Sequence, residues 1–136
     1  MRDYQPQKNN PYWIPHEQYM QTLYFIRSYY KMKEQHDDLI EQGKSLSDLD
    51  GMPHGTGVSD ETAQKAIAAE RLFNKIAIID QAKRLIPDKY REAVWRNVMY
   101  REKYATIESE RQVRKYKGLF VRTVAEKAEI YVNYFD

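Results

Sequence analysis

Residues 109–122 read Ser-Glu-Arg-Gln-Val-Arg-Lys-Tyr-Lys-Gly-Leu-Phe-Val-Arg, and on a helix they separate into an apolar face and a basic face. At about 100° per residue, apolar and cationic side chains fall on opposite sides of the helix. The apolar side holds Val113, Tyr116, Phe120 and, one turn further on, Val124. The basic side holds Arg111, Arg114, Lys115 and Arg122. The segment therefore predicts a helix that docks by one face and presents cations on the other.

Gly118 lies in the middle of this basic stripe. A glycine inside a helix costs about 1 kcal/mol relative to alanine, but its missing side chain lets another backbone approach closely. Two visitors are equally compatible with this glycine, namely a phosphate backbone and a neighbouring helix.

Three further segments carry apolar residues at helical spacing. Pro15 and Pro87 are suited to the first turns of the helices that follow them. Ser59 offers an N-cap for the helix that begins at about residue 60. Gly43 provides an end for the first helix, and Ser109 with Gln112 forms a capping box for the last. The predicted helices cover about residues 15–42, 60–86, 88–100 and 109–131.

The remaining segments show no regular periodicity. Residues 1–14 are interpreted as a flexible N-terminal arm, and residues 43–58 hold four of the five glycines and form a loop by composition. No segment alternates as a strand would. We therefore expect an all-α fold with a single helical domain over residues 15–136. The first two helices should form a long hairpin in which four apolar side chains pack together, followed by a C-terminal pair resembling a helix-turn-helix. The four side chains are Leu23, Ile26, Ile76 and Ile79.

The composition argues against several classes of function. The 136 residues include no cysteine, so the chain has no disulfide, thiol nucleophile or cysteine-type zinc site. The three histidines stand 18–20 residues apart without metal-ligand spacing, and no catalytic motif appears. No signal pattern and no apolar run of about 18 residues suggests export or membrane insertion. We expect a cytoplasmic protein that is not an enzyme and needs no metal or cofactor.

The charge distribution indicates an anionic partner. The chain has a net charge of +2, but residues 87–122 contain ten Lys and Arg against five Asp and Glu. This segment therefore carries +5, whereas the rest of the chain carries −3. Tyr90 and Tyr116 occupy apolar helical positions, which favours packing. Tyr104, in the connection before the last helix, is better placed to contact a ligand.

Three segments carry a resemblance to a known family. They are Asp50-Gly-Met-Pro-His-Gly-Thr-Gly-Val-Ser-Asp-Glu-Thr-Ala63, Ile86-Pro-Asp-Lys-Tyr-Arg-Glu-Ala-Val-Trp-Arg-Asn-Val-Met-Tyr100 and Arg114-Lys-Tyr-Lys-Gly-Leu-Phe-Val-Arg-Thr-Val-Ala125. Over about residues 15–131 the chain resembles small phage and prophage proteins of Gram-positive bacteria, similar to late-gene transcriptional regulators of the RinA/ArpU type. The resemblance implies a C-terminal segment, related to sigma-factor region 4, that binds promoter DNA. One departure is that only residues 101–108 are available for the scaffold helix of such a segment.

These observations lead to an expected function in phage gene control. We expect a DNA-binding transcriptional regulator that binds double-stranded DNA as a homodimer. The expected contact residues are Arg101, Lys103, Tyr104, Arg111, Arg114, Lys115, Lys117, Gly118 and Arg122. The alternative is a protein-interaction or assembly module, such as a packaging or host-takeover factor. In that case the basic helix would meet an acidic surface of a phage or host protein.

Overall fold

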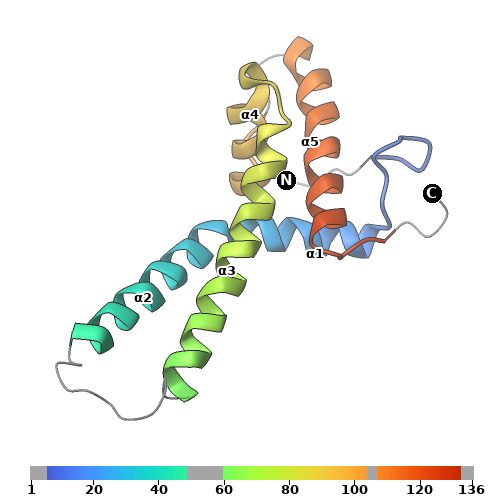
Figure 1. The fold of residues 1–136 in the computed structure, drawn as a ribbon. Helices are drawn as coiled ribbons and strands as arrows, with labels where there is room; N and C mark the ends of the chain where they lie inside the picture. Colours follow the sequence, from blue (N-terminus) through green and yellow to red (C-terminus); the bar gives the residue numbers. More distant parts are fainter. Residues whose placement is uncertain (1–5, 49–59, 104–106, 133–136) are drawn as a thin grey trace. The chain divides into compact units, whose positions relative to one another are not determined.

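The computed structural model describes residues 6–48, 60–103 and 107–132. Over these ranges the chain forms helices and turns without a strand, so the predicted all-α class is confirmed. Figure 1 shows the helices in chain order. They are α1 (His16–Arg27), α2 (Tyr29–Asp48), α3 (Asp60–Arg84), α4 (Asp88–Tyr100) and α5 (Ile107–Lys127).

The chain groups into two compact units, whereas the sequence led us to expect one helical domain. Unit 1 combines Met1–Ser28 with Ile78–Asp136, and unit 2 is Tyr29–Ala77. Unit 1 therefore contains α1, α4, α5 and the end of α3. Unit 2 contains α2 and most of α3.

The predicted helix over residues 15–42 is instead two helices, because Ser28 separates α1 from α2. The Ser28 hydroxyl donates a hydrogen bond to the Tyr24 carbonyl at 2.9 Å. Its backbone N–H also donates hydrogen bonds to the carbonyls of Tyr24 and Phe25. Serine hydroxyls that bond the carbonyl four residues earlier tend to bend a helix. The predicted stop at Gly43 is also wrong, since α2 continues to Asp48 and a glycine only weakens a helix.

The core of unit 1 forms where α1, α4 and α5 pack against one another. The first half of the predicted helix 15–42, which is α1, thus packs with the C-terminal helices. Trp95 of α4 meets Phe120 of α5 edge to face, with ring centroids 6.3 Å apart. The fully buried side chains of this core include Tyr19, Leu23, Ile26, Ile79, Val94, Val98, Val113, Phe120, Val121 and Val124. The predicted apolar face of residues 109–131 is therefore buried as expected.

The α4–α5 pair differs from the helix-turn-helix that we expected. Tyr90 contacts Tyr116 and Trp95 contacts Phe120, so the contacts follow the same order along both helices. Figure 1 draws α4 and α5 alongside each other. A helix-turn-helix joins two helices at about 90–120° through a turn of 3–4 residues. Here residues 101–106 connect the end of α4 to α5.

The bounds of α5 are shifted from the predicted 109–131. The helix begins at Ile107, so Ser109 and Gln112 lie inside it and do not form the predicted capping box. It ends at Lys127 because the backbone turns at Glu129, which has a left-handed φ of 57°. The Ile130 N–H then bonds the Ala125 carbonyl at 2.9 Å. Such left-handed caps satisfy the last carbonyls of a helix.

Among the side chains of unit 2 that the structure describes, few apolar ones are buried. Tyr29, Met32, Ala69 and Ile76 are buried, and the His36 and Phe73 rings of α2 and α3 lie 6.1 Å apart. Its exposed large apolar residues are Tyr30, Ile40, Ile67 and Phe73. Part of the predicted loop 43–58 belongs to α2, and the rest lies outside the described residues.

Candidate nucleic-acid interface

Three of the predicted contact residues share the exposed side of the first half of α5. Arg111, Arg114 and Lys115 are all exposed to solvent. The guanidinium of Arg114 pairs with the carboxylate of Glu110, with Nη2 and Oε1 2.7 Å apart. Among the described residues, Arg111 forms no ion pair. This part of the basic stripe is therefore accessible to an anion, although Glu110 partly neutralises it.

A fourth cation joins this surface from α4. Tyr90 and Tyr116 stack with centroids 5.5 Å apart and ring planes 21° from parallel. The Lys89 ammonium lies 5.6 Å from the centre of the Tyr90 ring, and the Lys115 ammonium lies 5.4 Å from the centre of the Tyr116 ring. The stacked pair thus brings the start of α4 to the middle of α5. We define the basic patch as Lys89, Arg111, Arg114 and Lys115.

Lys89 is a contact candidate that sequence reasoning missed. The sequence placed it in a basic segment and in the first turn after Pro87. Its place in the patch depends on the direction in which α4 packs along α5, which periodicity does not give. The only local signal was a tyrosine beside a lysine in both helices, at 89–90 and at 115–116.

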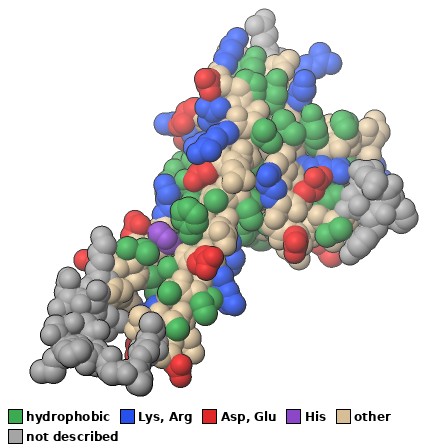
Figure 2. All heavy atoms as spheres, viewed as in Figure 1, with side chains coloured by type: hydrophobic (Ala, Val, Ile, Leu, Met, Phe, Trp, Pro, Cys, Tyr) green, Lys and Arg blue, Asp and Glu red, His purple; other side chains and the backbone are tan. Residues whose placement is uncertain are grey.

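The charged surface of α4 and α5 is mixed. Figure 2 shows Lys and Arg side chains in blue over the upper end of these helices, with red carboxylates among them. Arg96 is one cation that forms ion pairs with neighbouring carboxylates. Its side-chain hydrogen bonds to Glu92 and Glu102 raise the pKa of its guanidinium. Arg96 thus has two acidic partners and is not part of the basic patch.

The predicted contacts Arg101 and Lys103 lie elsewhere. Both are exposed, and Arg101 caps the C-terminus of α4 in the left-handed conformation, with φ 57°. At this end of α4, Arg27 of α1 donates a hydrogen bond to the Val98 carbonyl at 2.8 Å. Arg101 is about 16 Å along the helix axis from Tyr90, at 1.5 Å per residue. The structure therefore does not bring Arg101 together with the basic patch. Lys103 follows Glu102, whose carbonyl accepts a hydrogen bond from the Asn97 side chain of α4, and Tyr104 lies outside the described residues.

The second half of the basic stripe is covered, which corrects our expectation of a continuous free face. Lys117 is only 5% exposed, because it lies on the buried face of α5, four residues from both Val113 and Val121. Gly118 is buried, and a Cβ placed on it would lie 3.2 Å from the Pro6 ring and 3.3 Å from Tyr12. The Arg122 side chain is 17% exposed and bonds Glu126 at 2.6 Å. These three residues are not open to DNA in this conformation.

The covering element is the N-terminal segment that the sequence suggested was a flexible arm. Over residues 6–14 this interpretation is wrong, because the segment packs on α5 and ends at Ile14, which is 1% exposed. The segment that approaches Gly118 is thus neither a phosphate backbone nor a neighbouring helix, the two possibilities that we considered. Residues 1–5 lie outside the described residues.

Comparisons with protein-family models, with curated proteins and with solved structures found no match for this chain. None of the described helices is both long enough and apolar enough to cross a membrane. Within the same residues, no group of three or more His, Asp or Glu side chains is arranged to hold a metal ion.

Proposed function

We propose that the protein binds double-stranded DNA through the basic patch. The observation that carries the proposal is that four exposed cations come from two helices that the Tyr90–Tyr116 stack holds together. The cations are Lys89, Arg111, Arg114 and Lys115. Phosphate contacts supply most of the affinity of non-specific DNA binding, and Lys and Arg side chains make most of them.

An extended polyanion suits this patch better than a small anion. Arg111 and Lys115 are one helical turn apart on α5, and Lys89 comes from the other side of the Tyr90–Tyr116 stack. Separated, solvated cations bind a row of phosphates well, because each neutralises one charge and releases one counterion. A helix of about 10–12 Å in diameter also fits the DNA major groove, which is about 12 Å wide.

The biological setting that we propose rests on the resemblance of the sequence to phage late-gene regulators. In this setting the protein acts in the cytoplasm as a homodimer and regulates transcription of phage genes. The α4–α5 arrangement means that α5 would approach DNA without the turn and crossing of a helix-turn-helix.

A second candidate function is favoured by unit 2. Its exposed large apolar side chains Tyr30, Ile40, Ile67 and Phe73 lie on two helices with few buried residues. A partner protein that covered these side chains would bury apolar surface, which favours association. A phage assembly module that binds other proteins through α2 and α3 would use this surface, and a homodimer would use it as well.

The two functions differ in their response to salt. Fluorescence anisotropy with a labelled mixed-sequence duplex would measure the dissociation constant from 50 to 200 mM salt. DNA binding through the patch predicts that log affinity falls linearly with log salt concentration, by about 0.9 for each phosphate contacted. Absence of binding at 50 mM salt would reject the DNA-binding proposal and leave the assembly module.

A further inference from the structure

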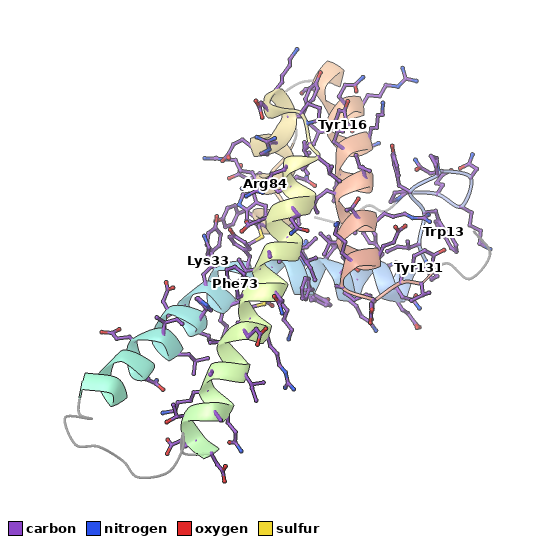
Figure 3. The ribbon with its side chains drawn as sticks, viewed as in Figure 1. Trp13, Lys33, Phe73, Arg84, Tyr116 and Tyr131 are labelled. Carbon is purple, nitrogen blue, oxygen red and sulfur yellow. The ribbon has the colours of Figure 1, made fainter. Side chains whose placement is uncertain are left out.

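Residues 6–13 form a strap on the second half of α5. We call these residues the N-terminal strap. Pro6 and Tyr12 fill the notch at Gly118, where they lie within 3.3 Å of the position of a Cβ. Figure 3 shows Trp13 beside the lower half of α5, on the same side as Tyr131. The strap therefore lies where the basic stripe would continue.

Arg122 is the polar anchor of the strap. Its guanidinium donates hydrogen bonds to the carbonyls of Pro11 at 2.9 Å and Trp13 at 3.1 Å. The Tyr131 ring covers the same group, with its centre 5.1 Å from the guanidinium carbon. Both bonds come from one nitrogen, Nη1, whereas Nε pairs with the Glu126 carboxylate at 2.6 Å. Guanidinium N–H groups of this kind also donate to phosphate oxygens. The strap carbonyls thus occupy positions that phosphate oxygens can take.

The strap is weakly held compared with the chain that follows it. Residues 7–11 are exposed, and only Pro6, Tyr12 and Trp13 are half-buried. Ile14, in contrast, is fully buried in unit 1. Segments with few buried apolar contacts open at a small fraction of the free energy of global unfolding. The strap can therefore leave α5 while Ile14 stays in place.

The covered positions continue the patch along one line of α5. Residues 111, 115, 118 and 122 follow each other at spacings of four, three and four, which places them on one side of a helix. The first two are exposed and the last two lie under the strap. The strap thus ends the accessible cation row after Lys115.

We propose that Arg122 forms a second phosphate-binding position, which the strap occupies until DNA displaces it. This inference rests on the proposed DNA binding and adds a regulation of the same surface. Hydrogen bonds from a guanidinium to an ionised acceptor are roughly twice as strong as those to a neutral one. A phosphate therefore replaces the two strap carbonyls favourably once the half-exposed Glu126 side chain, the present ionic partner of Arg122, turns to solvent.

A redox-controlled lock tests the proposal on the full chain. The Cβ of Tyr12 lies 3.3 Å from the Cβ position of residue 118, close to the spacing of about 3.5–4.5 Å found in disulfides. Because the chain has no cysteine, the double variant Y12C/G118C can form only this intramolecular bond. The single variants Tyr12→Cys and Gly118→Cys are matched controls, since neither can close the lock within one chain.

The readout is duplex binding in the oxidised and reduced double variant. We expect the reduced form to bind the duplex more tightly. Its plot of log affinity against log salt concentration should be steeper by about 0.9, because Arg122 then contacts one more phosphate. The two controls, checked to carry no disulfide between chains, should not respond to reductant. Equal affinities and slopes in both redox states, with DNA bound, would overturn the strap inference and leave DNA binding intact. If the wild-type chain binds no duplex, the DNA-binding proposal itself fails.

Hydrogen exchange on the wild-type chain gives a second test that needs no substitution. Within the strap, the Asn10 and Trp13 amides donate to the carbonyls of Gln7 and Asn10. We expect saturating duplex to speed exchange of the Asn10, Tyr12 and Trp13 amides, while amides of α4 remain protected. Unchanged or slower exchange in the strap with DNA bound would contradict displacement.

Discussion

Tyr90 and Tyr116 stack with their ring centroids 5.5 Å apart, which fixes the first turn of α4 against the middle of α5. This contact brings Lys89 to the same surface as Lys115, although 26 positions separate the two lysines in the sequence. The stack is therefore both a packing contact and the element that assembles the basic patch.

The stack should contribute to the stability of unit 1. We expect Tyr116→Ala to lower the free energy of unfolding by about 2 kcal/mol, since the ring is half-buried and an aromatic pair adds about 0.5–1.5 kcal/mol to the area term. Tyr116→Phe keeps the ring and should stay within about 0.5 kcal/mol of wild type. Urea unfolding followed by circular dichroism measures both. A similar loss from Tyr100→Ala, at an exposed ring, would argue against a specific role for the stack.

Arg91 should contribute more than Arg96 to the stability of unit 1. Its guanidinium donates to the carbonyls of Lys83 at 3.1 Å and Ile86 at 2.8 Å, where α3 ends. A lysine ammonium lacks the planar fork needed to reach both carbonyls. Arg91→Lys should therefore cost about 1–2 kcal/mol. The control Arg96→Lys changes exposed ion pairs and should cost less than Arg91→Lys. Equal losses in urea titrations would contradict this assignment.

Much of the helical pattern could be predicted from local signals. The bounds 88–100 match α4 because Pro87 fixes the start, and the start of the helix at residue 60 is also confirmed. The break at Ser28 was missed because serine is common inside helices, and only its back-bond to Tyr24 marks the bend. The end at Lys127 depends on the left-handed conformation of Glu129. Because glycine is the residue that usually adopts this conformation, a glutamate there does not signal a helix end in the sequence.

The candidate site could be predicted only in part. Periodicity separated the cations of α5 from its apolar face, and Arg111, Arg114 and Lys115 are exposed as expected. It could not show that Pro6 and Tyr12 cover Gly118, because this contact joins segments more than 100 residues apart. The charge of Arg122 gave no sign that two backbone carbonyls hold it.

Self-association through unit 2 should depend on its exposed apolar residues. Phe73 is 58% exposed on α3, and we expect Phe73→Lys to shift the proposed homodimer toward the monomer by at least tenfold in dissociation constant, or about 1.4 kcal/mol. Leu85→Lys is the matched control, since Leu85 is 53% exposed in unit 1. Light scattering at micromolar concentration gives the mass. A wild-type monomer across this range would contradict the dimer, and equal effects of both substitutions would contradict the use of unit 2.

The salt dependence of duplex binding tests the basic patch most directly. Alanine at Lys89, Arg111, Arg114 or Lys115 should each reduce the magnitude of the slope of log affinity against log salt by about 0.9. Lys31→Ala and Lys75→Ala remove exposed cations of unit 2 and should leave the slope unchanged. The decisive variant replaces all four patch cations with alanine. We predict that this fourfold variant keeps the wild-type melting temperature and loses most of the salt-dependent affinity. A folded fourfold variant that binds the same duplex with the wild-type slope would contradict it.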